Sequence, residues 1–457
     1  MKQRTHRRDF LKTSALTGAG VLILSSARSA RTYAANGKLN VAVIGVSGRG
    51  GSNLGDVSKE NIVALCDVNE QNLAGAAKRF PEAKTYADWR KCLDQKDIDA
   101  VVCSTPDHIH AFVNVWAMNR GKHGYCEKPL ANSVHEARTV RETYLKNKDK
   151  IATQMGTQMH ATDNFRRIVE LVRQGAIGAL KDCHVWCSRT PKGGEYLPAT
   201  TQPAPEGLDW ELWIGPSPMH PYNPGYVGGC LAWNRFWDFG SGQIGDMGSH
   251  MIDMAYWALD LRFPTTCEAE GTPVSTDTCP EWLKATWDHP ANDWRPAVKL
   301  YWYDGGKKPG MPMDIFDREK LFKGIWIRGD KGWLLGDYGW RILRPDNDLT
   351  YYKAPKKEEL IPPSLGHHKE WIQACKGDKT TLCNFDYSGA MIENNLLALA
   401  AYRTGETVKR KGKDNKEEEV TTSKKLEWDS KELKAANCPE VDQYIKKTYR
   451  EGWVLDG

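Results

Sequence analysis

The sequence predicts a doubly wound, parallel α/β domain followed by a second domain with a large, open and mainly antiparallel sheet. Between residue 39 and about residue 157, short apolar runs alternate with helical patterns, as they do in βαβ units. Further along the chain the runs alternate apolar and polar residues, which is typical of antiparallel strands with one open face. We therefore expect one domain over residues 37–160 and another over residues 161–457.

The strands predicted in the first domain are apolar almost throughout, as expected when helices cover both faces of a sheet. These strands are LNVAVIG, NIVALCD, IDAVVCST, HGYCEK and IATQMGT. Helical patterns separate them, including NEQNLAGAAKRF, DHIHAFVNVWAMNRG and SVHEARTVRETYLKNK.

The second domain is expected to begin with an amphipathic helix, TDNFRRIVELVRQGAIG. Its predicted strands include LKDCHVWCS, AVKLYWYD and GIWIRGDKGWLLGD. Residues 190–245 form a long stretch rich in Pro, Gly and Trp, and the charge run at residues 409–425 predicts a solvated loop or a hairpin tip. Two late helices, GHHKEWIQACKGD and FDYSGAMIENNLLALAAYRTG, are expected to pack back on the first domain.

The first 36 residues have the pattern of a twin-arginine export signal. Arg7 and Arg8 precede a short apolar stretch at residues 15–24, and small residues suited to cleavage follow between Ala27 and Ala35. The apolar stretch is too short to span a bilayer stably, so no membrane span is expected once the signal is removed. We therefore expect a periplasmic protein.

Charge and cysteine content exclude some classes of function. The formal net charge of +5 arises in the first 36 residues, which contribute +6, so the remaining chain carries −1 and has no basic footprint for nucleic acid. The twelve cysteines include Cys66, Cys103 and Cys126 in apolar runs, where buried free thiols are common. No zinc spacing occurs, although one disulfide between Cys375 and Cys383 stays an alternative.

The loop GVSGRGGSN after the first strand fits a dinucleotide-binding turn. Gly45 would form the tight turn, Ser47 takes the second glycine position, and Gly50 takes the third, with Gly48 and Arg49 between them. Asp67 ends the second strand 22 residues after Gly45, where an acid binds the adenosine ribose and repels a 2′-phosphate. The pattern predicts a Rossmann domain that binds NAD, although an arginine in the loop can also favour NADP.

The next strands place further polar groups at the same edge of the sheet, where ligands bind in such domains. Ser104, Thr105 and Pro106 are expected to line the cofactor channel, with His110 one helical turn further on. The alternative is that Ser104 and Thr105 cap a helix and that His110 is a buried structural histidine. Glu127 and Lys128 follow the next strand and are expected to face the nicotinamide.

The segment GDMGSHMID predicts a helix with Asp246, His250 and Asp253 on one face. A lysine, a histidine and carboxylates beside a nicotinamide suit alcohol oxidation, which needs a base for the hydroxyl proton and a cation for the developing alkoxide. Two alternatives are a helix cap with a structural histidine, and zinc binding by the three residues. The nucleotide site disfavours zinc, and we predict no metal.

The motifs EKPLA and GDMGSHMID resemble those of the glucose–fructose oxidoreductase, inositol dehydrogenase and MocA family (Gfo/Idh/MocA). LDWELWIGPSPMHPY, WNRFWDFGSG and YREGW are similar to exported members of that family. The resemblance implies that Lys128 and His250 form an acid–base pair and that Asp246 orients the substrate. It also implies a Rossmann domain followed by an α/β domain with an open antiparallel sheet, through which members often form homo-oligomers, here a dimer or tetramer.

Three functions compete at this point. The first is an NAD-dependent oxidoreductase that acts on a sugar, polyol or sugar derivative and holds its cofactor tightly. The second is a redox-neutral glycosidase, lyase or epimerase that oxidises a sugar transiently. The third is a non-catalytic sugar-binding module, which an intact set of Lys128, Asp246 and His250 disfavours. Trp210, Trp213, Trp233 and Trp237 would form either a sugar-stacking wall or the core of a loop.

Overall fold

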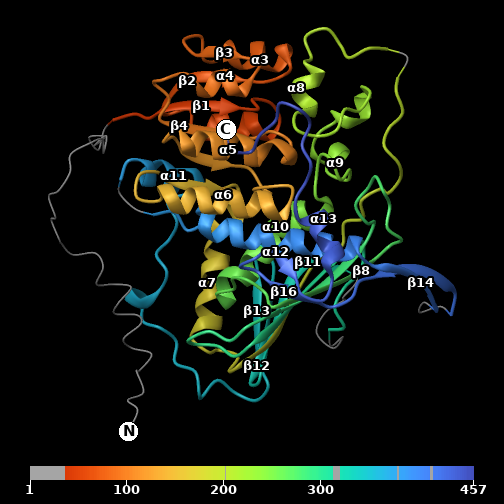
Figure 1. Ribbon diagram of the computed structural model, residues 1–457. Helices are drawn as coiled ribbons and strands as arrows, with labels where there is room; N and C mark the ends of the chain where they lie inside the picture. The colour runs from red at the N-terminus through yellow and green to blue at the C-terminus, as the bar shows by residue number, and fades with distance from the viewer. Residues whose placement is uncertain (1–36, 201, 312–319, 378–379, 412–414, 457) are drawn as a thin grey trace.

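The first domain is built on a six-stranded parallel sheet with the order β3-β2-β1-β4-β5-β6, seen near the top of Figure 1. The computed structural model describes residues 37–200, 202–311, 320–377, 380–411 and 415–456, so the expected export signal lies outside the described residues. The strands are β1 (Asn40–Ile44), β2 (Asn61–Cys66), β3 (Lys84–Tyr86), β4 (Ala100–Cys103), β5 (His123–Cys126) and β6 (Thr153–Met155).

The strand order reverses between β1 and β4, and crevices for ligands form at such a point. Both faces of the sheet are covered, because alternate residues of β1 and β4 pack into two separate hydrophobic clusters. The covering helices are α2 (Arg49–Asp56), α3 (Glu70–Ala77), α4 (Trp89–Leu93), α5 (Asp107–Asn119) and α6 (Val134–Asn147). This explains the continuous apolar runs in the sequence and confirms the predicted parallel α/β fold.

The second domain contains an eleven-stranded mixed sheet, which lies below the first domain in Figure 1. Its main path is β13-β12-β11-β7-β10-β9-β8-β15-β14, and β16 and β17 extend from β8. Neighbouring strands are antiparallel except for the parallel pair β7 and β10. The strands are β7 (Leu180–Cys187), β8 (Thr266–Gly271), β9 (Leu283–His289), β10 (Val298–Asp304), β11 (Lys323–Gly329), β12 (Gly332–Gly336), β13 (Arg341–Pro345), β14 (Glu406–Lys411), β15 (Glu417–Thr422), β16 (Leu426–Asp429) and β17 (Lys434–Ala435).

Helices from the second part of the chain join this sheet to the first domain. Trp371 and Cys375 of α11 (His367–Cys375) pack into the core beside β1 and β4, as the sequence predicted. The other α-helices are α7 (Asp163–Arg173), α8 (Trp210–Ile214), α9 (Cys230–Trp233), α10 (Gly242–Leu259), α12 (Phe385–Arg403) and α13 (Asp442–Ile445). Short 3-10 turns are η1 (Gln158–Ala161), η2 (Pro224–Tyr226), η4 (Lys357–Glu359) and η5 (Pro439–Val441).

Two sequence interpretations are settled by the fold. The charge run at residues 409–425 was predicted to be a solvated loop or a hairpin tip, but most of its described residues lie in the paired strands of the β14–β15 hairpin, and residues 423–425 form the connection to β16. All twelve cysteines are free thiols, so the alternative disulfide between Cys375 and Cys383 is not formed. Among the helices that the structure describes, none combines the length and apolarity needed to cross a membrane.

Candidate active site

The glycine-rich loop has the close contacts that a dinucleotide-binding turn requires. Gly45 has a φ of +81°, and a Cβ on it would lie 2.5 Å from the carbonyl oxygen of Ser104. A Cβ on Gly50 would lie 1.9 Å from the carbonyl oxygen of Gly45, which fixes the start of α2 against β1. Gly48 has a φ of +54° and faces open space, so its backbone is accessible to a pyrophosphate.

Asp67 follows β2 directly and lies beside this loop. Its carboxylate accepts hydrogen bonds from the backbone N–H groups of Val46 and Asn69, both at 3.0 Å. Burial raises the pKa of Asp67, and these hydrogen bonds act in the opposite direction. The acid is therefore held at the position where a ribose would lie, while Ser47, Gly48 and Arg49 stay exposed around the loop.

Glu127 connects the glycine-rich loop to residues 127–129 after β5, here called the lysine turn because they include Lys128. Its buried carboxylate accepts hydrogen bonds from Arg49 Nε at 3.0 Å, Asn53 Nδ2 at 3.0 Å and Gln158 Nε2 at 2.9 Å. Burial would raise the pKa of Glu127, but the Arg49 cation and the hydrogen bonds outweigh it and lower that pKa. Glu127 therefore remains ionised and fixes the residue that precedes Lys128.

Lys128 and Asp246 bring the two domains together. Lys128 follows β5, and its Nζ contacts Oδ1 of Asp246, which lies in the second turn of α10. The second oxygen of Asp246 accepts a hydrogen bond from Arg189 NH1 at 2.7 Å. Burial opposes the charge on Lys128, yet Asp246 raises the pKa of Lys128 overall. The two cations in turn lower the pKa of Asp246 against its own burial.

His250 lies one helical turn beyond Asp246. Burial and the nearby Lys128 cation lower the pKa of His250 to about 4, so the imidazole is neutral at pH 7. Its buried Nδ1 has no hydrogen-bond partner among the described residues. The site therefore combines a protonated lysine, an ionised aspartate and a neutral histidine, which is able to accept a proton.

Comparisons with known proteins identify the fold and its cofactor class. A sequence model described as an oxidoreductase family with an NAD-binding Rossmann fold matches residues 39–155, and the C-terminal α/β domain of the same family matches residues 186–292. The chain belongs to the Gfo/Idh/MocA oxidoreductase family. This assignment agrees with the family resemblance stated from the sequence and with its NAD-binding domain.

Curated members of the family are similar over part of their length. Levoglucosan dehydrogenase of Pseudarthrobacter phenanthrenivorans is 30% identical over 198 residues, which cover 43% of this chain and 42% of that protein. A glycosyl hydrolase family 109 protein of Solibacter usitatus is 32% identical over 205 residues, covering 39% and 44%. Inositol 2-dehydrogenase of Salmonella typhimurium is 29% identical over 145 residues, covering 31% and 43%. The matches thus span less than half of these relatives.

Solved structures share the fold over most of the chain. The WlbA dehydrogenase of Bordetella pertussis, in complex with NADH and UDP-GlcNAcA, has a TM-score of 0.56 at 15% identity and covers 80% of this chain and 96% of its own. Levoglucosan dehydrogenase with NADH and levoglucosan has a TM-score of 0.51 at 20% identity and covers 79% and 97%. These likenesses support the two-domain architecture of the Gfo/Idh/MocA fold.

Asp253, the second acidic residue predicted for this helix face, does not join the site. Asp253 contacts His160 Nδ1 at 3.0 Å and accepts a hydrogen bond from Tyr387 OH at 2.7 Å. Its side chain is fully buried, and Asp246, His250 and Asp253 do not form a metal-ligand cluster within the described chain. The alternative zinc set is therefore not assembled.

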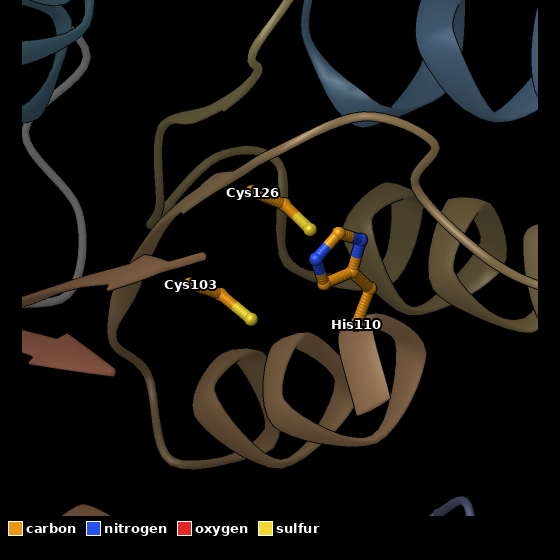
Figure 2. A group of neighbouring side chains, drawn as sticks. All are labelled: Cys103, His110 and Cys126. Atoms are coloured by element: carbon orange, nitrogen blue, oxygen red, sulfur yellow. The ribbon is translucent and has the colours of Figure 1, made fainter. Parts of the chain in front are cut away.

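His110 connects two loops of the site through its ring nitrogens. Figure 2 shows its ring pointing toward the sulfur atoms of Cys103 and Cys126, which end β4 and β5. The ring nitrogens of His110 lie 2.6 Å from the Pro129 carbonyl oxygen and 2.8 Å from that of Thr105. The three side chains could hold a metal ion by proximity, but a metal would have to displace one of these carbonyls. His110 instead ties the loop after β4 to the Lys128 turn.

The remaining predicted residues have mixed surroundings. Ser104, Thr105 and Pro106 form the half-buried loop between β4 and α5, and Ser104 Oγ accepts a hydrogen bond from Asn53 Nδ2 at 2.9 Å.

The four tryptophans considered for a sugar-stacking wall pack into the protein. Trp213, Trp233 and Trp237 lie in hydrophobic clusters, and Trp210 packs against one of these clusters and stacks on Trp213, with ring centroids 4.7 Å apart. They are thus core residues of the 190–245 segment and do not form an open wall.

Arg189, Asn53 and Gln158 contact the site but were not predicted from the sequence. Arg189 lies two residues beyond β7 and more than fifty residues before its partner Asp246, so no local spacing joins them. Asn53 and Gln158 reach Glu127 from α2 and η1 in the same non-local way.

We predict that Gly50→Ala weakens NAD binding at least tenfold and lowers the melting temperature. The added methyl group must displace the Gly45 carbonyl, and Gly45 has no room to move toward the Ser104 carbonyl that lies against it. Calorimetric titration with NAD and thermal unfolding measure both effects. Gly55→Ala in the same helix is the control, because its Cβ meets nothing within 4 Å. Wild-type NAD affinity in the Gly50 variant would contradict the assignment.

Proposed function

We propose that the protein is an NAD-dependent oxidoreductase that removes a hydride from a CH–OH carbon of a sugar, polyol or sugar derivative. The observation that carries the proposal is the arrangement of Lys128, Asp246 and His250 at the carboxyl ends of the parallel strands. The names of the levoglucosan and inositol dehydrogenase relatives support this substrate class.

The charges of the site suggest a distinct role for each residue. Neutral His250 is placed to accept the hydroxyl proton of the substrate, because its pKa of about 4 leaves it unprotonated at neutral pH. Protonated Lys128 is placed to hold the oxygen as negative charge develops on it. Asp246 keeps Lys128 charged and in position. NAD, when bound, supplies the hydride acceptor.

The Gly45–Gly50 loop and Asp67 would hold that NAD. Gly48 leaves backbone accessible to the pyrophosphate, and the Asp67 carboxylate suits the ribose hydroxyls. A Cβ at Gly45 or Gly50 would collide with backbone, so the loop is shaped for close approach.

A redox-neutral glycosidase is the second candidate. The similarity to glycosyl hydrolase family 109 proteins, and to an α-N-acetylgalactosaminidase of Shewanella oneidensis, favours it. Such an enzyme would use the same lysine and histidine but would leave no net NADH after turnover. Conversion of a glycoside without lasting absorbance of NADH would therefore select this function over net oxidation.

We also propose that the protein is exported by the twin-arginine route and carries its cofactor to the periplasm. The Arg7–Arg8 pair and the apolar stretch that follows support export of a folded chain. Residues from the second domain brace the loop after Asp67: Glu70 N donates to Gly207 O at 2.8 Å, and Asp209 N donates to Val68 O at 2.9 Å. These contacts restrain the adenosine end of the cofactor site and favour slow release.

Self-association through the second sheet is part of the same proposal. Strands of this sheet carry aromatic side chains that are only half-buried, among them Tyr301 of β10 and Trp333 of β12. Phe322, just before β11, is 51% exposed. An apolar surface of this kind fits a second copy of the chain, as a dimer or tetramer.

We predict that Lys128→Ala gives a folded protein that still binds NAD, with a lower melting temperature because Asp246 loses a partner, and lowers turnover by about 10²- to 10⁴-fold. The change removes the cation that would hold the reacting oxygen, and such groups contribute rate factors of that order. Absorbance of NADH across a panel of sugars and polyols measures turnover, with the exposed Lys146→Ala as a control. Near wild-type rates in the Lys128 variant would refute its role.

We predict that the purified protein holds close to one nicotinamide nucleotide per chain after extensive dialysis. An enzyme exported in this way would leave the cytoplasm in which its cofactor was bound, so it would need a very slow off-rate to keep that cofactor. Mass spectrometry of nucleotide released by denaturation should identify NAD and not NADP, because Asp67 disfavours a 2′-phosphate. Protein that purifies empty and needs millimolar added NAD would contradict this prediction.

A further inference from the structure

Arg189 is a charged group in the site that the proposed chemistry does not use. Its NH1 donates to Oδ2 of Asp246 at 2.7 Å, while Lys128 occupies the other carboxylate oxygen. The Arg189 side chain is 34% exposed, compared with 14% for Lys128 and 9% for Asp246. Arg189 is therefore the member of this group that is most open to an incoming molecule.

The guanidinium of Arg189 has hydrogen-bond donors beyond the one that contacts Asp246. An arginine side chain carries five N–H donors in a planar fork. Within the described ranges of the chain, NH1 is the only one of its nitrogens that has a hydrogen-bond partner. The Nε and NH2 groups are therefore available to a ligand that reaches Lys128 and His250.

The charges around Arg189 leave a surplus of at most one positive charge. Asp246 balances one of the two cations that contact it, and His250 is neutral at pH 7. Cys230 is an exposed residue, but desolvation of its thiol by neighbouring atoms and the nearby Asp246 raise the pKa of that thiol to about 12, so it is also neutral. Burial raises the pKa of Asp107 to about 7, so this carboxyl is only partly ionised at pH 7 and offsets only part of the surplus. Bound NAD would add the positive charge of its oxidised ring, which further favours an anion.

We propose that the substrate carries a carboxylate, as in a sugar acid, and that Arg189 binds this group through its free nitrogens. The inference rests on the proposed function and names its substrate class. A planar carboxylate matches the guanidinium fork with two parallel hydrogen bonds. One surplus cation matches a monoanion, whereas a phosphate carries nearly two charges at neutral pH. We therefore favour a carboxylate over a phosphate.

A purely structural role for Arg189 explains less of the geometry. Lys128 already fixes Asp246. Orienting this carboxylate does not require the Arg189 side chain to be one-third exposed, whereas binding a ligand does. The distinction is measurable, because a structural role would affect acidic and neutral substrates equally.

Binding provides the first test and does not depend on turnover. The NAD-loaded protein is titrated with glucuronate, with glucose and with glucose 6-phosphate, and thermal unfolding and calorimetry are recorded. We expect glucuronate to bind about tenfold to a hundredfold more tightly than glucose, the range for hydrogen bonds to charged groups. Equal binding of glucuronate and glucose would overturn the inference, and preferential binding of the phosphate would assign a phosphate site instead.

Variants of Arg189 then locate the effect. Arg189→Gln should remove the preference for glucuronate, and Arg189→Lys should retain only part of it, because lysine keeps the charge but lacks the fork. Arg235→Gln is the matched control, since Arg235 donates to the Gly193 carbonyl and lies over the Phe236 ring without contacting Asp246. A preference that survives in Arg189→Gln would overturn the assignment to this residue.

Turnover separates this inference from the proposed function. With uronates and their neutral counterparts as substrates, Arg189→Gln should lower kcat/KM at least tenfold more for the acids than for the neutral sugars, mainly through a higher KM for the acids, because any loss that arises from Asp246 is shared by both classes. Loss of kcat on both classes alike would show that Arg189 only positions Asp246. If neutral sugars reduce NAD and uronates do not, the proposed oxidoreductase function stands and the proposed carboxylate substrate is wrong. If no sugar reduces NAD but glucuronate still binds through Arg189, the proposed oxidoreductase function is wrong and the carboxylate site stands.

Discussion

The contact between Lys128 and Asp246 is the interaction on which the rest of the site depends. Lys128 belongs to the parallel sheet of the first domain, and Asp246 belongs to a helix that packs on the sheet of the second. The buried charge of Asp246 and the largely buried charge of Lys128 are tolerated there because each compensates the other. Their pairing fixes how the two domains meet, and it places His250 one helical turn away, beside the lysine.

Several hydrogen bonds hold the elements around this pair in place. Glu127, anchored by Arg49, Asn53 and Gln158, fixes the residue before Lys128. His110 holds the turn after it through the carbonyl of Pro129. On the other side, Arg189 restrains the second oxygen of Asp246. The lysine turn is thus supported by the nucleotide loop, by α5 and by the second domain together.

Local patterns predicted much of this arrangement. The apolar runs, the glycine spacing from Gly45 to Gly50 and the acid at Asp67 each depend on near neighbours, so the first domain could be read from the sequence. The spacing of Asp246 and His250 likewise defined one helix face. β8 was not among the predicted strands, although its buried Cys267 and Ala269 alternate with half-buried Glu268 and Glu270, because this alternation is short and only weakly apolar. Asp253 shares the helix but turns to His160 and Tyr387, which only tertiary packing decides.

A double-mutant cycle on Lys128 and Asp246 tests the central claim most directly. Lys128→Met, Asp246→Asn and the double variant are compared with wild type in single-turnover reduction of bound NAD by a substrate identified in the sugar panel. If Asp246 acts by holding Lys128 charged and in position, the double variant should be no slower than the more damaged single variant. Losses that multiply in the double variant would show that the two residues act independently and would contradict this account.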